Sequence, residues 1–174
     1  MAKEWLRSSM LTLRSPEPED LELMYRMEND TALWSVGSAT LPYSRHTLRN
    51  YLEQSVQDLY REHQARFVIE LSDGSAVGMI DLADFDLHNS RAEVCIGLLS
   101  EYRMRGLGRE ALLLLCDYAM NFLHIHQLYA YIPVSNVESE TLFSSVGFVR
   151  SALLKEWKRM PEGYCDVLLF QLIA

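Results

Sequence analysis

Three arginines and two glycines stand close together in the stretch SEYRMRGLGREALLLLC, residues 100–116. Glycines ahead of a helix allow backbone N–H groups to converge, and the positive end of the helix dipole attracts anions. Arg103, Arg105 and Arg109 concentrate positive charge there, although the chain as a whole carries a formal net charge of −8. We therefore expect this stretch to bind an anion such as a phosphate group.

Other interpretations of this loop have to be weighed. GLGREA, residues 106–111, fits the G-x-G-x-x-A form of a dinucleotide fingerprint, but the next predicted strand ends in PVSN, without the acid that would hold a ribose. The chain contains no G-K-[ST] sequence, which excludes a P-loop. A structural alternative is a glycine turn whose arginines are simply solvated, and the motif alone does not decide against it.

The surrounding sequence predicts an α/β protein in which this loop joins a strand to a buried helix. Alternating or continuous apolar residues predict strands at 10–14, 66–71, 76–85, 91–99, 127–134, 148–157 and 165–173. Helices are predicted after an N-cap at Ser15, over roughly 44–64, over 108–122, and after a capping box that begins at Ser135. Because no repeat, linker or low-complexity segment interrupts the chain, we expect one domain over residues 1–174.

The composition limits the kinds of partner. An acidic chain without an extended basic stretch is not expected to bind nucleic acid, but it favours a cationic substrate. No apolar run is long enough to span a bilayer, so no membrane association is expected. The three cysteines are scattered outside any C-x-x-C pair, which indicates reduced thiols, a cytoplasmic location and no metal site.

Two spaced motifs resemble those of the GNAT superfamily of N-acetyltransferases. Arg103-x-x-Gly106-x-Gly108, between a strand and a buried helix, resembles the loop that binds the pyrophosphate of acetyl-CoA. Asn136, followed by a helix that terminates at Gly147, resembles a later motif of the same family. The order of the predicted elements also fits the family over the whole length of the chain.

The resemblance carries expectations about fold and subfamily. It implies an α/β (α+β) fold with a mixed, mostly antiparallel central sheet flanked by helices, in which splayed strands hold acetyl-CoA. Within the family, segments 66–94 and 100–108 look most like spermidine and ribosomal-protein-type acetyltransferases.

The resemblance also implies which residues meet the co-substrate acetyl-CoA. Backbone amides of the arginine-glycine loop would cradle the pyrophosphate, and the strand edge at 96–98 would pair with pantetheine and stabilise the thioester oxygen. Asn136 would hydrogen-bond the cofactor, and Phe143 stands where the family usually has a tyrosine that protonates the departing thiolate. The predicted cofactor-binding residues are Ile96, Gly97, Leu98, Arg103, Met104, Arg105, Gly106, Leu107, Gly108, Arg109, Asn136 and Phe143.

The implied reaction transfers an acetyl group to a primary amine, which must lose a proton. An alkylamine with a pKa near 10.4 is only about 0.1% neutral at pH 7, so a base is useful. By resemblance, Glu93 is the first candidate for this catalytic base and Asp81 is the second. Glu28, Asp30 and Trp34 fall where the family places its acceptor, and we expect them to bind the substrate.

Two classes of function remain open at this stage. The favoured one is an acetyl-CoA-dependent N-acetyltransferase that acts on a small cationic amine such as a polyamine, or on a protein N-terminus. The alternative is a catalytically weak acyl-CoA-binding module, which only Phe143 supports. The stretch SVGSATLPYSR, residues 35–45, lacks the acidic residues that polyamine acetyltransferases carry there. A homo-oligomer is left open.

Overall fold

The computed structural model describes residues 4–34, 41–56, 58–160 and 162–174. Its strands are β1 (Leu11–Arg14), β2 (Ala65–Leu71), β3 (Ala76–Asp86), β4 (Arg91–Leu98), β5 (Gln127–Pro133), β6 (Val149–Met160) and β7 (Gly163–Ile173). Its α-helices are α1 (Leu21–Glu28), α2 (Thr31–Trp34), α3 (Arg45–Gln54), α4 (Leu59–Glu62), α5 (Leu107–Asp117) and α6 (Val137–Val146). Short 3₁₀ turns precede α1 and α5, and a π-helical turn, Tyr118–Phe122, follows α5.

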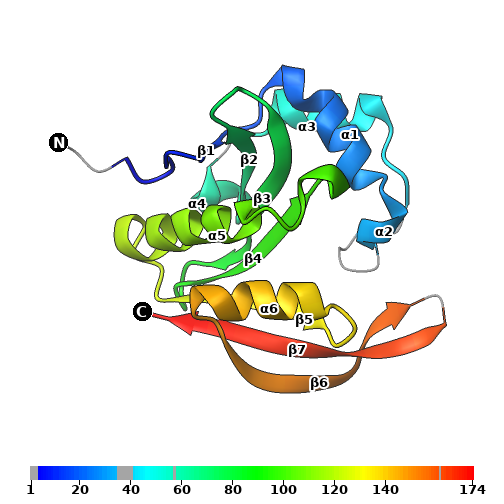
Figure 1. Cartoon of the computed structure of the whole chain (residues 1–174), viewed down its shortest axis with the longest axis vertical. Coiled ribbons are helices and arrows are strands. Elements are labelled where there is room, and N and C mark those ends of the chain that lie inside the picture. Colours follow the sequence, from blue (N-terminus) through cyan, green and yellow to red (C-terminus); the bar gives the residue numbers. More distant parts are fainter. Residues whose placement is uncertain (1–3, 35–40, 57, 161) are drawn as a thin grey trace.

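These strands form one sheet in the order β1-β2-β3-β4-β5-β7-β6 (Figure 1). Each neighbouring pair is antiparallel except β4 and β5, which run parallel. The parallel pairing is confined to residues 91–93 of β4 and 127–129 of β5, beyond which the two strands separate. The expected mostly antiparallel sheet with splayed central strands is thereby confirmed.

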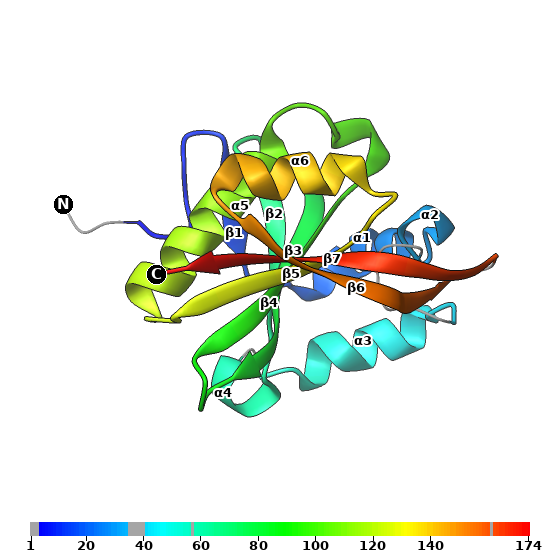
Figure 2. The same ribbon diagram turned by 90° about the horizontal axis from the view of Figure 1, so that it is seen from below.

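Helices cover both faces of the sheet, and each face has its own hydrophobic core. Figure 2 shows α5 and α6 on one side of the sheet and α3 on the other. Leu112 and Leu115 of α5 belong to the larger core. Met24 and Met27 of α1 and Leu48 of α3 belong to the smaller one, on the opposite face. Successive residues of a strand point to opposite faces, so every second residue of β2, β3 and β4 faces α1 and α3.

Two helices on the acceptor side differ from the sequence-based predictions. Helix α1 begins at Leu21 rather than directly after Ser15, because Pro18 disfavours helical backbone at Glu17, which is extended at φ −118° and ψ 162°. The helix predicted over 44–64 is divided into α3 and α4. The Asp58 carboxylate accepts hydrogen bonds from two following amides, which starts a new helix instead of continuing the old one.

Helix α6 also begins one residue later than the predicted capping box. Its N-cap is Asn136 rather than Ser135, and the Asn136 side chain accepts a hydrogen bond from the Ser139 amide at 3.1 Å. Asparagine and serine are about equally good N-caps, so sequence preference could not choose between them. Gly147 ends the helix in the left-handed conformation at φ +106°, as predicted.

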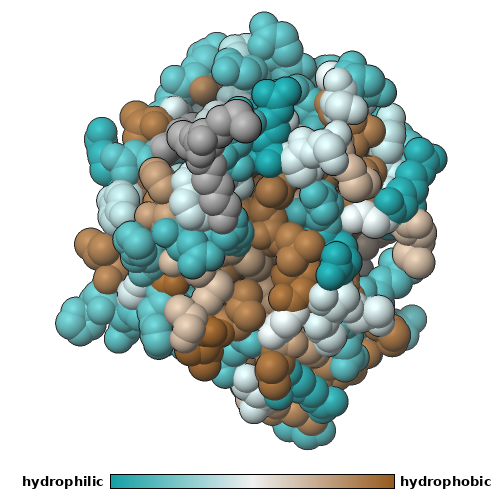
Figure 3. All heavy atoms as spheres, turned by 60° about the vertical axis from the view of Figure 1, so that its left-hand side comes forward, coloured by the Kyte–Doolittle hydropathy of each residue, from teal (hydrophilic) through white to brown (hydrophobic). Residues whose placement is uncertain are grey.

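Apolar side chains also reach the surface. Figure 3 shows hydrophobic residues gathered in the middle of one face, with hydrophilic residues around them. Among the described residues, no helix is long and apolar enough to cross a membrane.

Candidate active site

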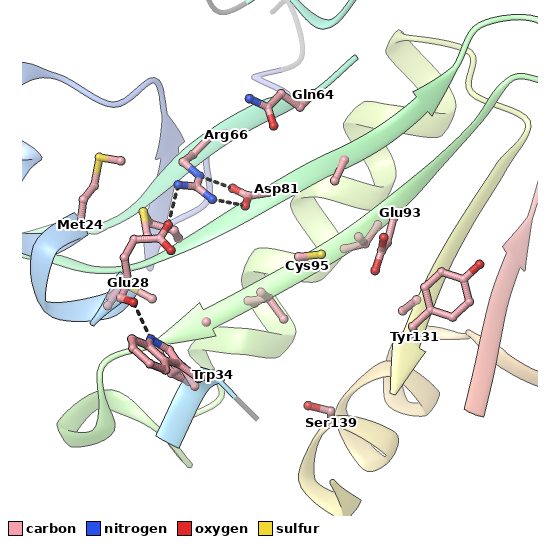
Figure 4. Close-up of a pocket in the computed structure, with 18 of the residues that line it drawn as sticks. Met24, Glu28, Trp34, Gln64, Arg66, Asp81, Glu93, Cys95, Tyr131 and Ser139 are labelled. Carbon is pink, nitrogen blue, oxygen red and sulfur yellow. Dashed lines mark hydrogen bonds and ion pairs between the residues drawn. The ribbon is translucent and has the colours of Figure 1, made fainter. Parts of the chain in front are cut away.

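A cavity of about 550 Å³ lies where β4 and β5 separate, with side chains converging from several elements (Figure 4). Residues 94–97 of β4 and 130–133 of β5 form its two strand walls, and Ser139 of α6 lies at its edge. On the other side it extends beneath α1 and α3, where Met27 is among the lining residues. The splay therefore opens into a pocket that two different substrates could enter from opposite ends.

The backbone of β4 directs polar groups into this splay. The Leu99 amide donates to the Val77 carbonyl at 2.9 Å, so the alternation of an antiparallel pair turns the backbone groups of Gly97 toward β3. The backbone groups of Ile96 and Leu98 then face away from β3, toward the gap. The Leu98 carbonyl already accepts a hydrogen bond from Arg103 Nε at 3.0 Å. Of the predicted edge 96–98, Ile96 therefore offers the most open backbone.

Gly97 contributes space rather than backbone hydrogen bonds. A Cβ atom at this position would lie 2.9 Å from Cε of Met27. Gly97 lines the cavity directly, and its missing side chain keeps the passage between β4 and α1 open.

The two glycines of the loop have different surroundings. Gly106 is the N-cap of α5 with φ +79°, and a Cβ atom there would meet nothing within 4 Å. Gly108 is buried, and its Cβ would lie 3.4 Å from Leu142 of α6 and 3.6 Å from Leu98. Gly106 thus leaves open space ahead of the helix, whereas Gly108 permits close packing of α5 on α6. A phosphate role for Gly108 rests on its backbone amide alone.

The other loop residues also divide into packed and exposed groups. Leu107 is buried in the core, while Met104 is 88% exposed with φ +59°. The Arg105 guanidinium lies over the Tyr102 ring at 5.4 Å, and Arg109 is solvent-exposed. The loop therefore turns through left-handed backbone at Met104 and Gly106 to reach the helix start.

The surroundings of the Arg103 side chain indicate whether an anion fits at the start of α5. Its Nη2 atom is buried and has no hydrogen-bond partner among the described residues. A buried guanidinium nitrogen without a partner is costly, and a negatively charged oxygen would satisfy it. Together with the glycine-capped start of α5, this atom fits the phosphate-bearing end of acetyl-CoA.

Asn136 and Phe143 of α6 both line the cavity. The Asn136 oxygen is occupied in capping the helix, which leaves its amide NH₂ group for a ligand. Phe143 is only 3% exposed, and its ring meets Phe148 edge-on with centroids 5.0 Å apart. Phe143 is thus part of the core and part of the cavity wall at the same time.

Glu93 stands at the point where the strands begin to separate. It is the last residue of β4 that pairs with β5, opposite Tyr129, and it lines the cavity. Burial raises the pKa of Glu93, and the negative charge of Asp84 raises it further. A hydrogen bond with Cys95 and the charge of Lys158 act in the opposite direction. A carboxylate with a raised pKa is suited to accept a proton near neutral pH.

Asp81, the second candidate base, is held in an ion-pair network. Arg66 on β2 donates from Nε to Asp81 Oδ1 at 3.0 Å and from Nη2 to Oδ2 at 2.8 Å. Arg66 Nη1 also donates to Glu28 Oε1 at 2.8 Å. Burial lowers the pKa of Arg66, but the two carboxylates outweigh this effect and raise it above its ordinary value. Both Asp81 oxygens are therefore already engaged by the Arg66 guanidinium.

The predicted substrate residues are only partly brought together. Glu28 and Trp34 line the cavity, and Trp34 Nε1 donates to the Glu28 carbonyl at 2.7 Å. Asp30 is not among the described lining residues, and its carboxylate accepts a hydrogen bond from the Ala32 amide. In the described structure Asp30 serves the local turn into α2, and its role in binding the substrate stays a prediction. Of the stretch 35–45, residues 35–40 lie outside the described residues.

Sequence reasoning missed Arg66 and Cys95, which line the cavity, and Asp84, whose charge acts on Glu93. Arg66 pairs with Asp81 across the β2–β3 hairpin, a register that could have suggested the ion pair. Cys95 shares a face of β4 with Glu93, as strand alternation requires. Asp84 lies in the irregular part of β3 with φ +46°, so no regular pattern would have placed it near Glu93.

The chain thus combines an acid at the apex of two splayed strands with a helix that starts at an open glycine, an arrangement that suits a transferase using a coenzyme thioester. Residues 10–149 match the family model described as the acetyltransferase (GNAT) domain, so the chain belongs to this family. It is an acetyl-CoA-dependent N-acetyltransferase. No group of three or more His, Cys, Asp or Glu side chains that could hold a metal ion occurs among the described residues.

Several relatives match this chain over most of its length. A spermidine N(1)-acetyltransferase of Vibrio cholerae is 26% identical over 92% of this chain and 91% of its own length. A crystal structure of the V. cholerae spermidine N-acetyltransferase with CoA and spermine has a TM-score of 0.85 and 26% identity over 95% of this chain and 96% of that one. YdaF of Bacillus subtilis, a putative ribosomal N-acetyltransferase, is 26% identical over 94% of this chain and 91% of its own length.

Proposed function

We propose that the acceptor is a small cationic amine of the polyamine class and that Glu93 accepts the proton of its reacting nitrogen. The observation that carries this proposal is the charge of the cavity. Glu28, Asp81 and Glu93 face it, against the single guanidinium of Arg66 among the described lining residues. An excess of carboxylates in a partly enclosed pocket attracts ammonium groups. The V. cholerae relative, a spermidine acetyltransferase, supports the same class of acceptor.

Aromatic side chains add to this preference for cations. Trp34, Tyr43 and Tyr51 line the acceptor side of the cavity, and Tyr131 lines the wall formed by β5. Rings attract ammonium groups through their negative faces, by about 0.5–2 kcal/mol for each well-placed contact. A polyamine chain, which alternates charged nitrogens with short methylene segments, could place one nitrogen at Glu93 and others against the rings.

The chain's own residues account for the two ends of the reaction. We assign acetyl-CoA to the Ile96 backbone edge, the first amides of α5 and the unpartnered nitrogen of Arg103; once bound, acetyl-CoA supplies an activated acetyl thioester. On the acceptor side, Glu93 takes up the proton that the attacking nitrogen loses. The thiolate leaves without a proton from Phe143, at a cost of only about 2 kcal/mol at pH 7 for a thiol with pKa near 8.5.

The experiment that tests the proposal measures CoA thiol release from acetyl-CoA with a panel of acceptors. The panel contains spermidine, a diamine, a monoamine of equal length and a short peptide with a free N-terminus. We expect the polyamine and the diamine to give the highest kcat/KM. The resemblance to YdaF makes a protein N-terminus the second candidate, and a clear preference for the peptide would replace the first proposal with the second.

A further inference from the structure

Arg66 links three elements around the acceptor side of the cavity. It stands on β2, bonds both oxygens of Asp81 on β3, and bonds Glu28 at the end of α1, as Figure 4 shows. Its guanidinium also lies 5.7 Å from the centre of the Tyr51 ring on α3. The Arg66 and Asp81 side chains are only 23% and 19% exposed, so solvent screens their charges weakly.

The Glu28 end of this network shapes the cavity wall. Glu28 is the last residue of α1, where the helix dipole disfavours a negative charge, and the Arg66 guanidinium offsets that cost. The Glu28 carbonyl accepts the hydrogen bond from Trp34 Nε1. Arg66 therefore fixes the end of α1, and the end of α1 fixes the indole of Trp34.

The ion pairs of Arg66 also determine which carboxylate can bind the ammonium group of an acceptor. Among the described lining residues there are three carboxylates, and Arg66 occupies two of them. Glu93 is not part of this network and lies at the apex of the splay. Asp81 pairs with Cys95, two residues along β4 from Glu93, and Figure 4 shows Glu28 farther from Glu93, at the end of α1. An ammonium group held between Glu28 and Asp81 would therefore be displaced from Glu93.

We propose that Arg66 is a positioning residue that occupies Glu28 and Asp81 and thereby directs the acceptor's ammonium group to Glu93. The inference rests on the proposed function, since it requires a cationic acceptor. A guanidinium is better suited to this role than an ammonium, because its planar fork can bond two carboxylates at once while remaining charged.

Steady-state kinetics of Arg66→Met test this role. Without the guanidinium, Glu28 and Asp81 hold the acceptor ammonium in an unproductive place, which lowers kcat and KM together. We expect both to fall about tenfold for a diamine, with kcat/KM changed much less. Millimolar guanidinium ion should restore kcat by refilling the vacated position. Arg66→Lys should keep part of kcat, because it retains the charge but loses the fork.

A matched control is available on the surface. Arg45 makes a two-point ion pair with Glu22 and lies over the Tyr25 ring at 3.7 Å, but it does not line the cavity. Arg45→Met should leave kcat and KM unchanged. Acetyl-CoA affinity, measured for each variant, reports whether the cofactor side is still folded.

A second variant covers the case in which Arg66→Met does not fold. The triple variant Arg66→Met, Glu28→Gln, Asp81→Asn removes the buried charges together, which proteins often tolerate. It should recover kcat, because no competing carboxylate remains. A raised KM or an unchanged kcat in Arg66→Met would overturn the role of Arg66. So would a triple variant whose kcat is as low as that of Arg66→Met. Wild-type turnover with the amine panel tests the proposed function separately.

Discussion

Glu93 owes its suitability as a base to residues that lie near it in space. Burial and the charge of Asp84 both raise its pKa, so Glu93 gains its proton at a higher pH than an ordinary glutamate. As the pH decreases through the raised pKa of Glu93, the carboxylate that accepts the proton is lost, and kcat/KM should fall.

The effect of the Asp84 charge on the pKa of Glu93 can be tested with Asp84→Asn. Removing the neighbouring charge lowers the pKa of Glu93, so the acidic limb of the kcat/KM profile should move to lower pH. The shift is small because Asp84 is exposed and its field is screened. Asp73→Asn, in the β2–β3 turn, is the control and should leave the profile in place. An unmoved limb in Asp84→Asn would mean that Glu93 is not the titrating base.

Phe143 allows a gain-of-function test at the same scale. Because Phe143 lines the cavity, Phe143→Tyr should bring a hydroxyl near the departing thiolate and raise turnover about tenfold. Phe148→Tyr is the matched control, since Phe148 is equally buried and packs edge-on against Phe143 but does not line the cavity. A variant at 143 that melts at lower temperature and is no faster would assign this position to packing alone.

The individual site residues were predictable from sequence to different degrees. Glu93 was a candidate through the family resemblance, and strand alternation explains why its side chain lies on the cavity face. The ion pair between Asp81 and Arg66 could be expected from the hairpin, but the second ion pair of Arg66 could not. Its partner Glu28 is 38 residues away in the chain. The hydrogen bond of Asp30 to the turn before α2 was not foreseen, because a carboxylate that caps a local turn has the same sequence appearance as one that binds a substrate.

Among the elements, the start of α5 is where we expect the pyrophosphate of acetyl-CoA to bind. Gly106 has left-handed backbone and open space where a side chain would project. Gly106→Asn should weaken acetyl-CoA binding at least tenfold, because asparagine tolerates this backbone but its side chain would enter the anion's place. Binding is measured by calorimetry on the folded variant.

Gly74 supplies the matched control for this substitution. It also has positive φ, +87°, and a Cβ there would meet nothing within 4 Å, but it lies in the β2–β3 turn. Gly74→Asn should cost a similar amount of stability and leave acetyl-CoA affinity unchanged. If Gly106→Asn and Gly74→Asn bind acetyl-CoA with equal affinity, the pyrophosphate does not bind at the start of α5.

Most elements of the fold could be predicted from sequence, because the apolar period distinguishes strands from helices. The predicted strands all appear, with ends that differ by a few residues. Helix boundaries were less predictable. Pro18 delays α1, and the Asp58 cap divides the helix predicted over 44–64. The point at which β4 leaves β5 depends on contacts between distant segments and has no local signal.

At the scale of the whole molecule, net charge and cavity charge have the same sign. A chain with net charge −8 and a carboxylate-rich cavity should attract a polycationic acceptor over a distance. We expect kcat/KM for a polyamine to fall several-fold when salt is raised well above physiological concentration, because ions screen this attraction. The same salt should have little effect with a neutral aromatic amine. Equal salt dependence for both acceptors would argue against electrostatic recruitment.

The most direct test of the account compares the wild-type enzyme with Glu93→Gln in one competition assay. Acetyl-CoA is incubated with an equimolar mixture of polyamine, monoamine and peptide, and the acetylated products are quantified by mass spectrometry. We expect acetyl-polyamine to predominate, and Glu93→Gln to form it about 10²–10⁴-fold more slowly while still binding acetyl-CoA normally. Acetyl-CoA binding without any acetylated amine from the wild-type enzyme would contradict the account and leave only an acyl-CoA-binding module.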